Sequence, residues 1–286
     1  MASLAGSLFN NKDDKVGQQD THQQFFESRE QRVPRFPDTS NTRYQSHCAA
    51  AAELITRLDL YVEYLAWIRD GKERPGFTNL EQNVFEGLQD VPTQVELAVL
   101  TLYAETIGHP YMRVVRGPGT EQVNMLELGP LHFKVKAHIQ RTIEDPDILL
   151  NQDAGYEFGS MDGKPWHTPE ATKAVLKLSP SLPHLKPVLV AFFKGALTTW
   201  EHFTSEFEEG GLIHSTTAEE RDRAWMPPTN DVNEGALGAF CSYIQKKPNT
   251  TMLQYNALAK FKFNHTAAFV HQEFNSDDYA FVHKLA

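Results

Sequence analysis

Two carboxylates, Asp231 and Glu234, lie three residues apart just after a proline pair, in the stretch WMPPTNDVNEGALGAF (residues 225–240). Carboxylates can hold the Mg²⁺ ions that enzymes use to cleave phosphodiester bonds. They can also form a capping box, in which Asp231 as N-cap and Glu234 at N3 satisfy the free amides of a helix start. The spacing alone favours the capping box, since helix caps are far commoner than active sites.

A helix must position these carboxylates, and the proline pair limits where that helix can begin. Pro227 and Pro228 lack the backbone donor and push the residues before them out of the helical region. We therefore predict a helix that opens at Asp231, with Glu234 in its first turn. Beyond it, apolar residues recur at the i, i+3, i+4, i+7 spacing of one buried helical face: Leu237, Phe240, Cys241 and Ile244.

The run PPTNDVNEGALGAF resembles the C-terminal signature of hAT-superfamily cut-and-paste DNA transposases, in which a proline and a small polar run precede a Glu that opens a long helix. In that family the Glu is the third carboxylate of the DDE metal-binding set, and here it falls on Glu234. Gly235 follows it where many members have Arg. The segment SNTRYQSHCAAAAELI (residues 40–55) is similar to the T-R-aromatic-x-S segment after the second catalytic Asp, and LFNNK (residues 8–12) resembles the start of the helix before it.

This resemblance implies a fold and a metal chemistry. Members have an RNase H-like domain whose sheet comes early, a large helical insertion and a C-terminal helical dimerisation region. Their first two Asp lie on strands upstream of the T-R motif, whereas Asp13, Asp14 and Asp20 occur here without the β-branched run of a buried strand. We therefore expect an incomplete DDE set in a truncated or domesticated remnant. Such a protein would not cut DNA, would need no cofactor, and would bind Mg²⁺ at Glu234 only if the missing carboxylates were supplied.

The charge bears on the possible partners. A formal net charge of −10 over 286 residues argues against extended nonspecific DNA binding, which needs many Lys and Arg contacts to phosphate. Arg43, Lys246 and Lys247 are the basic residues nearest the family motifs and are candidates for DNA contact, although basic residues more often form a solvated face. The competing hypothesis is a helical interaction module without nucleic-acid function, in which C-terminal apolar helices bury against an identical partner. The residues that favour such a homodimer are Phe261, Phe263, Phe269, Phe274 and Phe281.

The helical patterns predict a mainly α fold with few or no strands, because period-2 alternation is almost missing. We expect a polar N-terminal segment, 1–40, that is either a short helix around Phe25 and Phe26 or a loose tail. A mostly helical domain, 41–286, would follow, with insertion-like helices in 41–224 and the catalytic-Glu and dimerisation-like helices in 225–286. The expected helices are 45–69, 78–88, 92–107, 131–144, one from 187, 217–225, 251–263 and 276–285.

Other residue types narrow the function class. No apolar run approaches the roughly 18 residues that cross a bilayer, and MASLAGSLF lacks the basic start of a signal peptide. We expect an intracellular protein, and a nuclear one if it contacts DNA. Cys48 and Cys241 should be core thiols. His132 and His138 are six residues apart, which is not the spacing of a helical metal pair, so core or surface histidines are expected.

Overall fold

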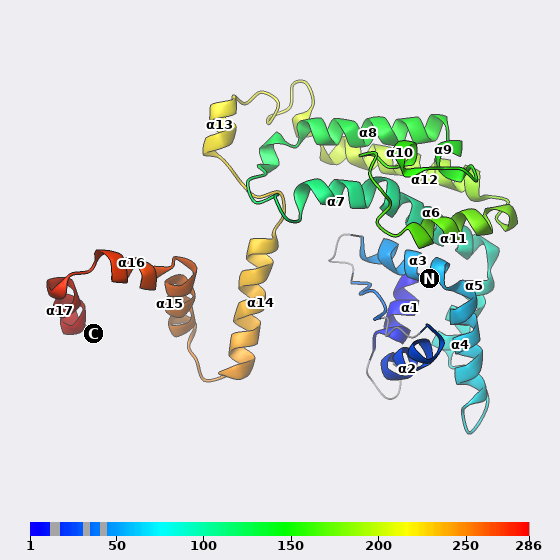
Figure 1. Cartoon of the computed structure of the whole chain (residues 1–286), viewed down its shortest axis with the longest axis horizontal. Coiled ribbons are helices and arrows are strands. Elements are labelled where there is room, and N and C mark those ends of the chain that lie inside the picture. The colour runs from blue at the N-terminus through cyan, green and yellow to red at the C-terminus, as the bar shows by residue number, and fades with distance from the viewer. Residues whose placement is uncertain (12–17, 31–34, 41–44, 286) are drawn as a thin grey trace. The chain divides into compact units, whose positions relative to one another are not determined.

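Residues 1–11, 18–30, 35–40 and 45–285 are described by the computed structural model, and they form helices joined by loops (Figure 1). Helix accounts for 72% of the chain and no strand occurs in these described ranges, so the predicted mainly α fold is confirmed. The chain divides into two compact units, which we call unit 1 (Met1–Pro228) and unit 2 (Thr229–Ala286). None of the described helices is both long and apolar enough to cross a bilayer.

Unit 1 holds most of the helices. The first are α1 (Ala2–Phe9), α2 (Gln19–Glu30), α3 (Ser46–Thr56), α4 (Leu58–Asp70), α5 (Asn79–Gln89) and α6 (Val91–Tyr103), which continues through the π-helical turn η1 (Ala104–Gly108) into α7 (His109–Val115). The later ones are α8 (Gly129–Glu144), α9 (Asp147–Leu150), α10 (Tyr156–Gly159), α11 (Pro169–Leu178), α12 (Leu185–Phe203) and α13 (Ala218–Arg223). Three 3-10 turns lie between them: η2 (Met125–Glu127), η3 (Ser179–Ser181) and η4 (Ser205–Phe207).

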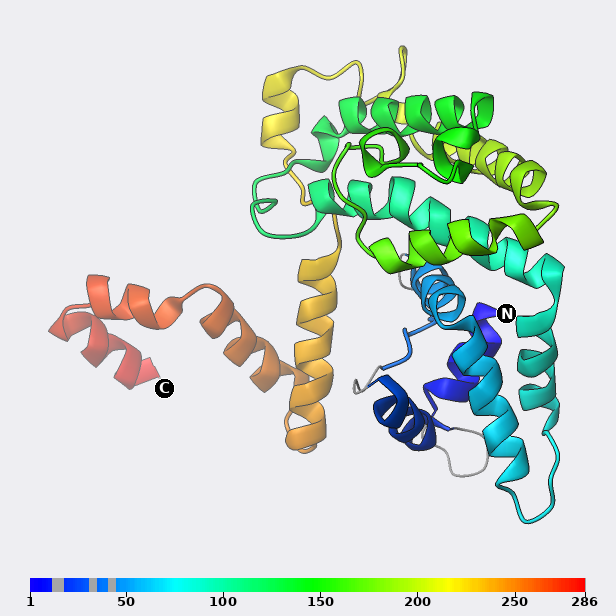
Figure 2. The same cartoon turned by 45° about the vertical axis from the view of Figure 1, so that its right-hand side comes forward.

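The centre of unit 1 is the contact between α3 and α6. Ala50 and Ala51 of α3 are fully buried, and such small side chains let two helix axes approach closely. α12 packs on both α6 and α8, and α8 and α12 run side by side in Figure 1 and Figure 2. α11 packs against α3 and α6. The core of unit 1 is therefore continuous from the N-terminal helices to α12.

The N-terminal residues add an aromatic cluster to this core. Of the two alternatives for residues 1–40, the helix around Phe25 and Phe26 is found as α2, and both side chains are buried. Helix α1 was not expected. Its Phe9 ring lies 5.3 Å from the Phe36 ring and 5.0 Å from the Tyr61 ring. Such aromatic contacts each contribute about 1 kcal/mol beyond area burial, so these two helices are part of the folded core of unit 1.

The prediction of one continuous helix over 45–69 is wrong at Arg57. This residue takes φ −123° and ψ 32°, which ends α3 and begins α4. Its guanidinium donates to the carboxylates of Glu30 and Glu53, each at 2.7 Å, and these two bonds hold the residue at the break. The apolar residues at helical spacing in this second helix are Leu58, Val62, Leu65 and Ile68, and α4 fully buries Leu65 of this stripe together with Tyr61, which lies outside it.

The remaining predicted helices occur near their expected bounds, as α5, α8, α12 and α13 in unit 1 and two helices of unit 2. The predicted helix 92–107 is also helical throughout, but its last turn, η1, is a π-helix. α11 lies in a proline-rich region where no helix was predicted. It begins at Pro169, whose fixed φ and missing amide suit the first position of a helix.

Unit 2 consists of α14 (Asp231–Lys246), α15 (Met252–Phe263), α16 (Thr266–Glu273) and α17 (Ser276–Leu285). The Tyr255 ring of α15 packs against Phe240 and Tyr243 of α14, with centroids 4.9 Å and 5.2 Å apart. α15 also packs on α16. Despite these contacts, no residue from 229 to 285 is buried. Unit 2 is thus a set of helices without an interior of its own.

Candidate functional site

Glu234 lies in the first turn of α14, but the predicted capping box is not formed there. Asn230 is the N-cap and Asp231 is the first helical residue, so Glu234 is the fourth helical residue and not the third. The Glu234 amide donates to the Asn230 carbonyl at 3.0 Å, the first bond of the helix. The Asp231 carboxylate accepts instead from the Thr229 hydroxyl at 2.9 Å. The capping prediction is wrong because Asp231 is already inside the helix, one position past the N-cap.

The surroundings of Glu234 do not fit a two-metal centre. Its side chain is exposed, and the other carboxylate in the same turn, Asp231, is engaged with Thr229. No group of three His, Cys, Asp or Glu residues that could hold a metal occurs among the described residues. Asp20 lies in the first turn of α2 and not on a strand. Asp13 and Asp14 lie outside the residues that the structure describes. Among the described residues, Glu234 therefore belongs to no group of three carboxylates.

The predicted DNA-contacting residues have different outcomes. Arg43 lies outside the described ranges. Lys246 and Lys247 are exposed at the C-terminal end of α14, where the Lys247 ammonium lies 5.5 Å from the centre of the Tyr243 ring. Lys260 and Lys262 of α15 are also exposed. These four lysines leave their charges accessible to a partner.

The apolar side chains of unit 2 are its most unusual feature. The predicted buried face of α14 is wrong: Leu237 and Cys241 are exposed, and Phe240 and Ile244 are only partly covered. Apolar side chains lie on all sides of α15 and not on one face. The large exposed apolar side chains of unit 2 are Val232, Leu237, Met252, Leu253, Phe261, Phe263, Phe269, Tyr279, Phe281, Val282 and Leu285.

Charge is divided unequally between the two units. Unit 2 contains five lysines, no arginine and five acidic residues, so its formal net charge is zero and unit 1 carries the whole charge of −10. Unit 2 itself therefore adds no net charge repulsion between two copies of the chain, whereas unit 1 does.

A buried carboxylate in unit 1 was missed by the sequence reasoning. Glu105 lies in the π-helical turn η1 and is fully buried. Its carboxylate accepts hydrogen bonds from the backbone amides of His167, at 2.7 Å, and Thr168, at 3.1 Å. Thr168 is the N-cap of α11 and its own side chain makes no capping bond. Glu105 therefore caps α11 from a different helix, and its charge complements the positive end of that helix.

Two histidines adjoin this carboxylate. The His109 Nε2 lies 3.6 Å from Glu105 Oε1, and the His109 ring stacks on that of His167 with centroids 4.1 Å apart. Burial, together with smaller electrostatic contributions from His167 and Arg113, lowers the pKa of His109 to about 4. His109 is therefore neutral near pH 7. A π-helical turn often marks a functional position, but here the capping of α11 accounts for Glu105.

The two histidines of α8, His132 and His138, are both buried, so they are core rather than surface histidines. His138 forms a hydrogen bond of 2.9 Å between its Nε2 and the Gly159 carbonyl. The His132 ring packs edge-on against Phe207, with centroids 4.5 Å apart. Burial lowers the pKa of each to about 4. Neither shares a metal-ligand cluster in the part of the chain that the structure describes.

Comparison with known proteins gave no match to a family model, to a curated protein or to a solved structure.

Proposed function

We propose that this chain is a helical protein derived from a hAT-like DNA transposase, and that it forms a homodimer through unit 2. The observation that carries the proposal is the apolar surface of unit 2, in which no residue from 229 to 285 is buried. Monomeric soluble proteins rarely expose apolar patches larger than a few hundred Å². So short a unit gains stability most readily by burying that surface in a second copy.

The available area is sufficient for a dimer. The large exposed apolar side chains of unit 2, at roughly 100 Å² each, present on the order of 1,000 Å², and a stable interface buries about 800 Å² per partner. A two-fold dimer places the same patch of each copy against the other, so an apolar patch meets an apolar patch. The zero net charge of unit 2 means that this contact brings no excess charge together.

The transposase relation rests on the motif and its setting. The resemblance requires a Glu that opens a long helix shortly after a proline, and Glu234 lies in the first turn of α14, the 16-residue helix that follows Pro228. The mainly helical composition is consistent with an insertion region and a dimerisation region. Because Glu234 alone cannot position two metal ions, we propose that the chain by itself does not cleave DNA.

A nicking assay tests this second part of the proposal. Supercoiled plasmid incubated with the protein and Mg²⁺ or Mn²⁺ should stay supercoiled. Metal-dependent nicking that Glu234→Ala abolishes would show that Glu234 works in a complete catalytic set and would overturn the remnant proposal.

Sedimentation tests the homodimer. The full chain should sediment as a dimer at micromolar concentration, and the double variant Leu253→Ser/Phe263→Ser should sediment as a monomer, because these side chains are 80% and 73% exposed. The matched control is Leu212→Ser/Phe158→Ser in unit 1, whose side chains are 77% and 70% exposed. This control should leave the dimer intact. A wild-type chain that stays monomeric at high concentration would refute the dimer.

DNA binding is the second candidate function, and the exposed lysines of α14 and α15 favour it. Fluorescence anisotropy with a labelled duplex should show an affinity that falls steeply as salt rises, since each phosphate contact releases counterions. Lys246→Gln/Lys247→Gln should reduce the slope of log K against log salt by about one for each of the two lysines that touches a phosphate. If the chain does not bind the duplex even at low salt, the DNA-binding proposal is refuted and the homodimer proposal stands alone.

A further inference from the structure

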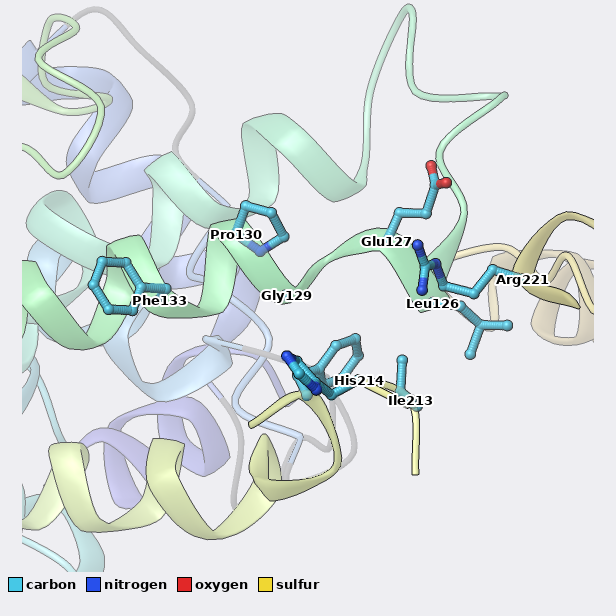
Figure 3. A pocket seen from close by; sticks show the side chains of 9 residues that line it. Leu126, Glu127, Gly129, Pro130, Phe133, Ile213, His214 and Arg221 are labelled. Atoms are coloured by element: carbon cyan, nitrogen blue, oxygen red, sulfur yellow. The ribbon is translucent and has the colours of Figure 1, made fainter. Parts of the chain in front are cut away.

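A groove on the surface of unit 1 is not used by the proposed function. It consists of two hollows that share the Phe133 ring as a wall, and we call it the α8 groove. The first hollow has a volume of about 560 Å³, and Figure 3 shows Phe133 at one end of it and Glu127 and Arg221 at the other. The second has a volume of about 410 Å³ and lies between α8 and α12, with Ala137 and Leu197 in its wall.

Local hydrogen bonds hold the walls of the groove in place. The amides of Ile213 and His214 both donate to the Glu206 carbonyl, at 3.0 Å and 3.1 Å, which folds this loop back beside α8. At the other end, the Asn124 side-chain amide donates to the Arg221 carbonyl at 2.9 Å. The groove is therefore preformed, and a partner that enters it need not order a loose segment.

The floor of the groove is apolar, with a large exposed aromatic anchor. Phe133 is 70% exposed, and it stands between the two hollows. Leu126, Pro130 and Ile213 line the first hollow beside it. Phe133 differs from other exposed rings such as Phe158 in lining two adjoining hollows, and large side chains that fill hollows of a partner are the ones that contribute most to binding.

The rim of the groove carries three carboxylates, Glu127, Glu201 and Glu208, and two cations, Lys136 and Arg221. The Lys136 ammonium pairs with Glu208, whereas the Arg221 guanidinium donates to the neutral Thr216 carbonyl at 2.6 Å and keeps its charge, so the rim has a formal net charge of −1. Glu127 and Glu201 have no ion-pair partner among the described residues. A nucleic acid would meet these carboxylates with its phosphates, so the rim disfavours it.

We propose that the α8 groove binds a basic amphipathic helix of a partner protein, with an apolar stripe on Phe133 and a lysine or arginine against Glu201. The stretch of α8 along the groove, from Gly129 to Gln140, matches a partner helix of about 12 to 15 residues, ~18–22 Å at 1.5 Å per residue. Helices that lie in a groove in this way anchor residues at i, i+3, i+4 and i+7. The inference concerns unit 1 alone and does not rest on the homodimer of unit 2.

The test uses labelled synthetic peptides and the full chain. The probe is a helical peptide of about 15 residues with leucine at i, i+3, i+4 and i+7, lysine at two positions beside that stripe and alanine or glutamine elsewhere, and its matched control has glutamate in place of both lysines. Fluorescence anisotropy should show binding of the lysine peptide and at least tenfold weaker binding of the glutamate peptide. Rising salt should weaken the binding of the lysine peptide, because salt screens exposed charge pairs.

Two pairs of variants locate the binding. Phe133→Ala should lower the affinity for the lysine peptide at least tenfold, because the variant removes the aromatic anchor. The control Phe158→Ala removes an equally exposed ring, at 70%, outside the groove, and should leave binding unchanged. Glu201→Gln should weaken binding two- to fivefold and reduce its salt dependence, whereas Glu96→Gln, exposed on α6, should do neither. Circular dichroism checks that each variant keeps the helix content of the wild type.

Three results would overturn the proposal. Equal affinity for the two peptides would show that the carboxylates of the rim do not select a basic partner. Unchanged affinity in a folded Phe133→Ala variant would place the binding elsewhere. A wild-type dimer that Phe133→Ala dissociates would show that the groove is covered by a second copy of this chain, and not by a basic helix of another protein.

Discussion

Mild acid should unfold unit 1, and His22 should account for a measurable part of the decrease in stability. The His22 ring is fully buried between Phe9, Phe26 and Tyr61, with centroids 4.5–5.6 Å away. Its Nε2 shares a hydrogen bond of 3.2 Å with the Tyr61 hydroxyl. Its Nδ1 has no hydrogen-bond partner in the ranges that the structure describes. Burial lowers the pKa of His22 to about 4, because a charged imidazolium would have no solvent there.

The direction of the effect follows from proton binding. Between the unfolded pKa of 6.5 and the folded pKa of about 4, the unfolded chain binds a proton at His22 and the folded chain does not. Stability therefore rises with pH across this window, is complete above about pH 6.5 and is lost as pH falls toward 4. The shift corresponds to about 3 kcal/mol at the acid end. His109, His132 and His138 have similarly lowered pKa values. The four shifts act in the same direction, so their combined effect is comparable with the whole stability of a domain.

The perturbation is His22→Phe, which replaces the titrating ring with another aromatic ring in an aromatic site. Urea unfolding followed by circular dichroism, repeated from about pH 7.5 to about pH 5, gives the free energy of unfolding at each pH. At the neutral end the variant should lose no more than about 2 kcal/mol, because it gives up one hydrogen bond and also removes an unpaired nitrogen. Toward acid, its stability should fall less steeply than that of the wild type, by about 2 kcal/mol between pH 7.5 and pH 5.

The control is His184→Phe, since His184 is an exposed histidine of the same unit. This variant should keep the steep pH dependence of the wild type. The reasoning would be refuted if His22→Phe and the wild type lost stability in parallel as pH falls. That result would mean that His22 binds its proton equally in the folded and unfolded chains.

Other predictions follow from single contacts in unit 1. Glu105→Gln should cost about 2–3 kcal/mol of unfolding free energy in a thermal melt, because a neutral amide replaces the buried carboxylate that caps α11. Ala51→Leu should cost about 1–3 kcal/mol, since a larger side chain must fit between α3 and α6, whereas Ala236→Leu on exposed α14 should cost little. In a timed assay with a thiol reagent, exposed Cys241 should react quickly and buried Cys48, whose pKa burial raises to about 11, should react only on unfolding.

The sequence predicts the helices of unit 1 well where apolar periodicity is regular, and it fails where one polar residue overrides the pattern. The stripe over 45–69 continues at helical spacing through Arg57 and gives no sign of a break. At the break the Arg57 guanidinium binds Glu30, which lies far away in the sequence. A bond between distant segments cannot be read from local spacing. The same holds for Glu105, whose partners His167 and Thr168 are more than sixty residues later.

Some missed elements did have a signal in the sequence. Ala2, Ala5, Leu8 and Phe9 form a short apolar face, and all four are buried in α1. Thr168 followed by Pro169 is a favourable helix start, and α11 begins there. The α8 groove had no such signal, because it forms only when the loop after α12 folds back beside α8. Single residues in it, such as Phe133, look ordinary in the sequence.

Unit 2 shows how far periodicity can be trusted. The spacing of Leu237, Phe240, Cys241 and Ile244 correctly predicts a helix, but it says only that one face is apolar and not what covers that face. In the folded chain α15 reaches part of it through Tyr255, and Leu237 and Cys241 remain exposed. An apolar helical face is stabilised only when something is packed on it. If that partner is a second copy of the chain, the apolar pattern predicts the buried surface of the dimer and not of the single chain. Sedimentation of the Leu253→Ser/Phe263→Ser variant tests whether the partner is a second copy.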